Sequence, residues 1–143
     1  MHPRAAALVA ALDLSPHPEG GWYREVHRSR IVVTPDDGRS SRQALTVIYF
    51  LLAEGQVSRW HTVASDETWH YHEGDVLELL VAGSPGAGDA VTLALGPVGL
   101  NVEPLRVVPA GRWQAARSTG AFTLVSCSVG PGFEFEDFEM EES

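Results

Sequence analysis

Histidine and acidic side chains are concentrated in one stretch of the sequence, from Gly55 to Asp75. It contains three of the six histidines, and Glu67 lies between His61 and the pair His70 and His72. Imidazole and carboxylate groups can pass protons to and from a substrate near neutral pH, and both can bind divalent metals. We therefore interpret His61, Glu67, His70 and His72 as candidate catalytic residues.

These four residues do not share one face of a regular strand. Successive side chains of a strand alternate between faces, so Glu67, Trp69 and Tyr71 lie on one side while His70 and His72 lie on the other. Both sets can line one pocket only if a β-bulge interrupts the alternation, and bulges are frequent beside active sites. Which face points inward stays open.

Aromatic and amide side chains elsewhere in the chain are candidates for the wall of a ligand pocket. We assign this role to Tyr49, Trp69, Tyr71, Trp113 and Gln114. Aromatic rings can stack on a flat ligand, and a tyrosine hydroxyl can donate a proton. A place in the hydrophobic core is the simpler interpretation for each ring.

The segments that must position these residues are mostly predicted strands. Pro3 to Leu14 has the apolar spacing of a helix with proline in its first turn. The loop Ser15 to Gly21 follows, with two prolines and a glycine pair; its His17 and Glu19 can cap the pocket or serve the turn. Alternating aromatic and acidic residues from Phe133 to Phe138 predict an edge strand. Other apolar segments between Gly and Pro turns predict strands at 22–27, 31–33, 44–53, 76–81, 90–95, 105–108, 113–116 and 122–129.

The composition is that of one acidic globular domain. With 143 residues and 44% hydrophobic content, the chain can fill a single core. Ten basic against nineteen acidic residues give a formal charge of −9, which argues against nucleic acid as a partner. No apolar run approaches the roughly 20 residues that span a bilayer, and the N-terminus lacks a secretory signal. We therefore expect no membrane association and a cytoplasmic location, where the single cysteine, Cys127, is a small buried side chain.

The Gly55–Asp75 stretch resembles the first motif of the cupin superfamily, G-x5-H-x-H-x3,4-E-x6-G. His61, Glu67 and Gly74 follow Gly55 at the spacings of the motif, while Val63 stands where cupins usually have their second histidine.

The second cupin motif contains P-x-G-x2-H, and Pro109, Gly111 and Gln114 match it, with glutamine in place of the histidine. In metal-binding cupins the two motifs supply three histidines and a glutamate to one metal. The resemblance carries over only His61 and Glu67, with Gln114 as a poor third ligand. A divalent transition metal is therefore open as a cofactor but is not required.

Most of the chain resembles one small single-domain branch of this superfamily, cupin family five, which has no assigned activity. The resemblance is carried by residues 17–21, 65–67, 69–75, 108–115 and 124–138. It implies an all-β fold, a cupin-type antiparallel β-barrel (double-stranded β-helix or jelly roll) with a short N-terminal helix. Residues 1–143 then form one domain, with the helix and loop at 1–21 and the barrel at 22–138.

Three functions follow as hypotheses. The first is an enzyme similar to sugar epimerases or isomerases, in which histidine and glutamate transfer protons on a polar small molecule. The second is a metal-dependent cupin enzyme, and the third is a non-catalytic module that binds a small ligand. The apolar run at 44–53 and the N-terminal segment offer an interface, so we also expect a homodimer.

Overall fold

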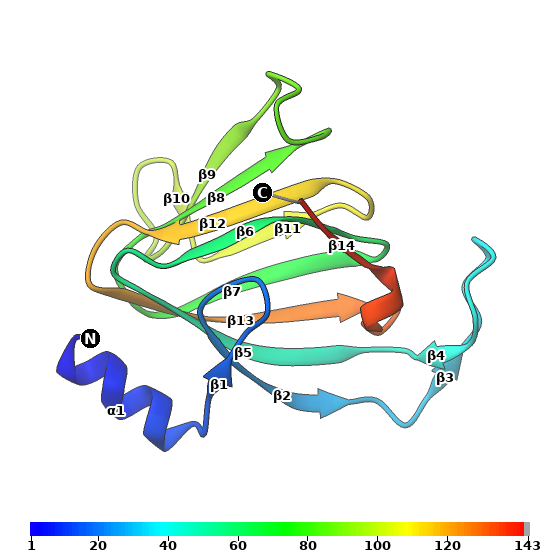
Figure 1. Ribbon diagram of the computed structural model, residues 1–143, viewed down its shortest axis with the longest axis horizontal. Coiled ribbons are helices and arrows are strands. Elements are labelled where there is room, and N and C mark those ends of the chain that lie inside the picture. The colour runs from blue at the N-terminus through cyan, green and yellow to red at the C-terminus, as the bar shows by residue number, and fades with distance from the viewer. Residues whose placement is uncertain (142–143) are drawn as a thin grey trace.

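Two six-stranded sheets face each other and enclose the core of the protein (Figure 1). The structure is a computed structural model that describes residues 1–141. The first sheet has the order β1 (Ser15–Pro16), β2 (Trp22–Arg28), β5 (Thr46–Ala53), β13 (Phe122–Gly130), β7 (Asp66–Gly74), β11 (Leu105–Val108). The second has the order β10 (Val102–Glu103), β9 (Val91–Leu95), β8 (Leu77–Ala82), β12 (Trp113–Ser118), β6 (Val57–Val63), β14 (Phe138–Met140). The predicted all-β cupin fold is confirmed.

Neighbouring strands are antiparallel except β9 and β10, which pair in parallel. A short third sheet joins β3 (Val32–Val33) to β4 (Arg42–Gln43) at one end of the molecule. Among the described residues, no helix has the length and apolar character needed to cross a membrane.

Side-chain alternation along β5 explains its long apolar run. Phe50 and Leu52 point between the two sheets and join the main core with Trp69, Leu77 and Leu79. The alternate residues, Leu51 and Ala53, point outward, where helix α1 (Pro3–Ala11) covers them with Ala5 and Leu8. The strand is therefore buried on both faces at this end, which removes the usual alternation of apolar and polar residues.

The N-terminal helix is shorter than predicted. The imidazole Nδ1 of His2 accepts a hydrogen bond from the backbone N–H of Arg4 at 3.1 Å and caps the first turn. The helix ends at Ala11, ahead of Asp13, whose φ of 54° lies in the left-handed region. A helix of L-residues cannot continue through that conformation.

The prediction of an edge strand from Phe133 to Phe138 is wrong for most of its length. Phe135–Asp137 form a 3-10 helix, η1, and only from Phe138 does the chain pair with β6 as strand β14. Charge explains the difference: arginines from the segment around β4 bind the acidic residues of η1 and draw this turn inward. The alternation of aromatic and acidic residues in the sequence does not reveal such ion-pair partners.

Candidate functional site

A pocket of about 190 Å³ opens at one end of the space between the sheets. Strands β2, β5, β6, β7 and β13 form its walls, together with the loop that contains His17 and the C-terminal segment from Phe133 to Phe138. Its lining residues are His17, Glu19, Tyr23, Glu25, Arg28, Thr46, Ile48, His61, Val63, Glu67, Cys127, Val129, Phe133, Phe135 and Phe138. Five titratable side chains of this lining are largely or fully buried: His17, Glu19, His61, Glu67 and Cys127.

His61 lies on β6 and is buried, with 2% of its surface exposed. Its Nδ1 is 2.7 Å from the backbone carbonyl oxygen of Arg59 and 3.1 Å from Oε2 of Glu19. A carbonyl oxygen only accepts, so Nδ1 carries the proton and Nε2 keeps its lone pair. Nε2 has no hydrogen-bond partner within residues 1–141. Burial lowers the pKa of His61 to about 4, so the ring is neutral at pH 7.

His17 has the opposite tautomer. Its Nδ1 accepts a hydrogen bond from the backbone N–H of Glu19 at 3.0 Å, so the proton of the neutral ring is on Nε2. The ring packs edge-on against Tyr23, with centroids 4.4 Å apart. Burial, and then the neighbouring His61, lower the pKa of His17 to about 4. The pocket thus contains one imidazole, His17, whose Nε2 can donate a hydrogen bond, and one, His61, whose Nε2 can accept one.

The backbone at Gly20 places Glu19 beside His61. Gly20 has a φ of 112°, and a Cβ built on it would lie 2.1 Å from the carbonyl oxygen of Val57. Only glycine allows the loop to approach β6 this closely. The N–H of Arg59 then donates to the carbonyl of Glu19 at 3.0 Å. Burial and then the charge of Glu67 raise the pKa of Glu19 well above its usual value.

Glu67 lies on β7 and faces the pocket from the other sheet. Nε2 of Gln114 donates to Oε1 of Glu67 at 2.8 Å, and Nε1 of Trp69 donates to Oε1 of Gln114 at 2.9 Å. Burial raises the pKa of Glu67 to about 7, against the opposing effects of hydrogen bonds from Gln114 and Cys127. Both protonation states are therefore populated near neutral pH, as a general acid–base requires.

His70 and His72 lie on the opposite face of β7, outside the pocket. Nε2 of His70 is 3.1 Å from Oγ1 of Thr68, and Nε2 of His72 is 2.8 Å from Oγ of Ser126. A bulge does interrupt the pairing of β7 with β13, but it lies at His72, after the residues that face inward. The structure therefore separates these two predicted catalytic residues from His61 and Glu67.

The five predicted ligand-binding residues are not in the lining of the pocket either. Tyr49 packs on the outer face of the first sheet, beside the cluster covered by α1. Trp69 is in the main core, and Tyr71 packs against that core and donates its hydroxyl to the carbonyl of Gly74 at 2.7 Å. Trp113 is half-buried on β12. Gln114 contacts the pocket only through Glu67.

The donor set does not fit the metal site that the cupin motifs imply. In residues 1–141, no three His, Cys, Asp or Glu side chains are grouped closely enough to hold a metal ion. Val63 lines the pocket where a second histidine would bind. Both ends of the Gln114 amide are already engaged, by Glu67 and by Trp69. Only His61 and Glu67 are left of the predicted ligand set, and structural or catalytic sites normally need at least three protein donors.

His17 and Glu19 line the pocket, whereas the sequence predicted only that they cap the pocket or serve the turn, and not that they are catalytic or binding residues. Their sequence signal is the loop itself: a glycine pair follows two residues that can titrate, and both glycines have positive φ. That pattern indicates a loop with a fixed shape, but not the strand against which it packs.

The facing sheets and the two motifs are features of a cupin. The family model described as "Cupin superfamily (DUF985)" matches residues 6–141, and the chain belongs to that family.

Two solved structures are similar over nearly the whole chain. A hypothetical protein from Leishmania major is 36% identical, with a TM-score of 0.87 over 96% of this chain and 86% of that one. Protein SO0799 from Shewanella oneidensis is 35% identical, with a TM-score of 0.86 over 96% and 84%. KdgF from a Halomonas species, 16% identical with a TM-score of 0.57 over 87% and 90%, shares the fold. No curated protein sequence gives a significant match.

Proposed function

We propose that this protein is an enzyme of the isomerase or epimerase type that moves protons on a small carbonyl compound. One observation carries the proposal: Glu67, with a pKa of about 7, shares a buried pocket with two neutral imidazoles of opposite tautomer. Proton abstraction next to a carbonyl needs a base that titrates near the working pH and a donor for the oxygen that becomes negative.

The roles follow from the protonation states. Ionised Glu67 removes a proton from the carbon beside the carbonyl, and the electron pair of the broken C–H bond moves into a carbon–carbon double bond. Nε2–H of His17 donates to the oxygen that takes up the negative charge, a task that suits a neutral imidazole. Nε2 of His61 accepts a hydrogen bond from a neighbouring hydroxyl group. For the isomer, the hydroxyl proton passes to the former carbonyl oxygen and Glu67 returns its proton to the former carbonyl carbon. For the epimer, the intermediate turns over and Glu67 returns the proton to the opposite face of the original carbon.

The size of the pocket limits the substrate. A volume of about 190 Å³ corresponds to roughly six water molecules in the liquid. A compound with one ring or a short chain fits this space.

Hydrogen–deuterium exchange tests the proposal. The protein is incubated in D₂O with a panel of small α-hydroxy ketones and aldehydes, and loss of the C–H signal beside the carbonyl is followed by proton NMR. We expect exchange in which Glu67→Gln lowers the rate by about 10²–10⁴-fold, the usual contribution of general acid–base catalysis.

The variant His70→Gln is the matched control, because it changes a titratable side chain of the same strand on the opposite face. Its exchange rate should stay within about twofold of the wild-type rate. Exchange that is unaffected by Glu67→Gln, or absent from the whole panel, would refute the proposal.

A further inference from the structure

The pocket lining combines hydrogen-bonding groups with aromatic surface. His17, His61 and Glu67 supply the hydrogen-bonding groups, and the phenylalanines of the C-terminal segment 133–138, here called the roof, supply the aromatic surface. Phe138 stacks on the His61 ring with centroids 5.4 Å apart. Phe133 packs edge-on against Phe135 with ring centroids 5.1 Å apart, and against Phe138 at 6.1 Å. A ligand that fills the pocket therefore contacts both hydrogen-bonding groups and aromatic carbon.

Arg28 is the only permanently charged cation among the described residues that line the pocket. A guanidinium has five N–H donors, and all five are engaged. Nε and Nη2 donate to the carboxylate of Glu25 at 3.4 and 2.6 Å. Nη1 donates to Gln43 at 3.2 Å and Glu134 at 3.3 Å, and Nη2 also donates to the carbonyl of Phe133 at 3.2 Å. No donor is left for a ligand, and two carboxylates already balance the charge.

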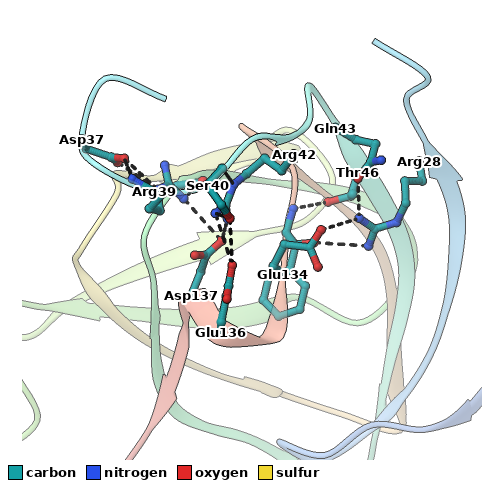
Figure 2. Close-up of polar contacts among 12 residues, drawn as sticks. Arg28, Asp37, Arg39, Ser40, Arg42, Gln43, Thr46, Glu134, Glu136 and Asp137 are labelled. Carbon is teal, nitrogen blue, oxygen red and sulfur yellow. Dashed lines mark hydrogen bonds and ion pairs between the residues drawn. The ribbon is translucent and has the colours of Figure 1, made fainter. Parts of the chain in front are cut away.

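The other arginines near the roof are bound in the same way (Figure 2). Arg42, with 1% of its side chain exposed, pairs with Asp137 and lies 3.5 Å from Glu136. Arg39 pairs with Asp37 at 2.9 Å and lies 3.5 Å from Asp137. These cations fasten the roof to the rest of the protein and do not face the pocket.

The charge of the pocket is consequently unfavourable for anions. Glu25 and Glu134 offset the charge of Arg28, and partly ionised Glu67 adds negative charge to the lining, whereas His17 and His61 are neutral at pH 7. A carboxylate or phosphate that entered would lose its hydration and would find neither an ion-pair partner nor a free guanidinium donor. An uncharged carbonyl or amide oxygen needs only the N–H of a neutral imidazole.

We infer that the pocket selects an uncharged small molecule that has both a carbonyl group and an apolar group, and that it rejects carboxylates and phosphates. This inference rests on the proposed function for the site and adds its substrate class. Arg28 is then a positioning residue, which ties β2 to the roof.

Benzamide and benzoate form a matched pair of probes, because they have the same shape and number of heavy atoms and differ in charge. Their binding to the full-length protein at pH 7.5 is measured by calorimetry and by the shifts of histidine ring resonances. We expect benzamide to bind roughly tenfold more tightly, or better, because the anion lacks a counter-ion. Benzoate binding that equals or exceeds benzamide binding, or no binding of either at millimolar concentration, overturns the inference.

The double variant Glu25→Gln with Glu134→Gln removes both carboxylates from Arg28. The affinity for benzoate should then rise roughly tenfold while that for benzamide changes little. The matched control is Glu54→Gln with Glu139→Gln, which removes the same charge from two exposed positions and should leave both affinities unchanged. If the affinity for benzoate rises equally in both double variants, a local role of Arg28 is refuted. The binding experiment tests the substrate class, and the deuterium-exchange experiment tests the proton-transfer function. Either proposal can therefore be refuted while the other stands.

Discussion

Replacement of Glu67 by glutamine is predicted to stabilise the protein above neutral pH while it removes the proposed catalytic base. The carboxyl group is buried, and its pKa is about 7 instead of the ordinary 4.5. Glutamine has nearly the same shape, and its carbonyl oxygen can still accept the hydrogen bond from Gln114 that Glu67 accepts at 2.8 Å. The variant therefore removes the buried charge but keeps the packing.

The sign and size of the effect follow from proton linkage. Well below pH 4.5 the carboxyl group is protonated in both the folded and the unfolded chain, so its burial as a charged group does not lower the free energy of unfolding. As the pH rises toward 7, the unfolded chain releases the proton while the folded protein keeps it, so stability is lost until the folded pKa is passed. The difference between the two pKa values corresponds to a total loss of about 3 kcal/mol in the free energy of unfolding. About 2.5 kcal/mol of this loss falls between pH 5 and 8.

Urea denaturation of the wild-type protein and of Glu67→Gln at pH 5, 6, 7 and 8 measures this difference. The free energy of unfolding of the variant should exceed that of the wild type by a margin that grows by about 2.5 kcal/mol over this range. Glu54→Gln, at an exposed position, is the control for loss of one negative charge, and its margin should stay constant. A margin for Glu67→Gln that does not change with pH would refute the reasoning.

Three further predictions concern the supports of the pocket. Gly20→Ala should cost at least about 2 kcal/mol and displace the loop, whereas Gly55→Ala, also at positive φ but in open space, should cost about 1 kcal/mol; equal losses in urea denaturation would contradict the close approach to β6. Arg42→Ala removes the nearer of the two arginines that pair with buried Asp137 and leaves Arg39 at 3.5 Å, so it should cost up to about 3–5 kcal/mol; a loss below about 1 kcal/mol would show that the pair is not formed. Gln114→Leu removes a hydrogen bond that favours ionised Glu67, so the pH midpoint of deuterium exchange should rise by about one unit, and an unchanged midpoint would contradict that role.

Motif spacing was sufficient to predict the fold and to select two of the pocket residues. His61 and Glu67 occupy fixed positions relative to the turns of the cupin motif, and the structure places both in the pocket. Strand alternation also grouped Glu67 with Trp69 and Tyr71 correctly. It could not tell which group points inward, because alternation is relative and the inner face is set by the opposite sheet.

The remaining pocket residues depend on contacts between segments far apart in the chain. His17 and Glu19 reach His61 only because Gly20 allows their loop to pack against Val57. The phenylalanine roof is formed by a turn that arginines around β4 hold in place. Neither contact has a local sequence period, so both required the folded structure.

The central claim is that Glu67 exchanges protons near neutral pH. Its side-chain carboxyl ¹³C resonance, identified by its loss in Glu67→Gln, can be titrated by NMR from pH 4 to 9. A midpoint near 7 is predicted, because burial raises the pKa of Glu67 to about 7. A midpoint near the ordinary value of 4.5 would contradict the role of Glu67 and, with it, the proposed function.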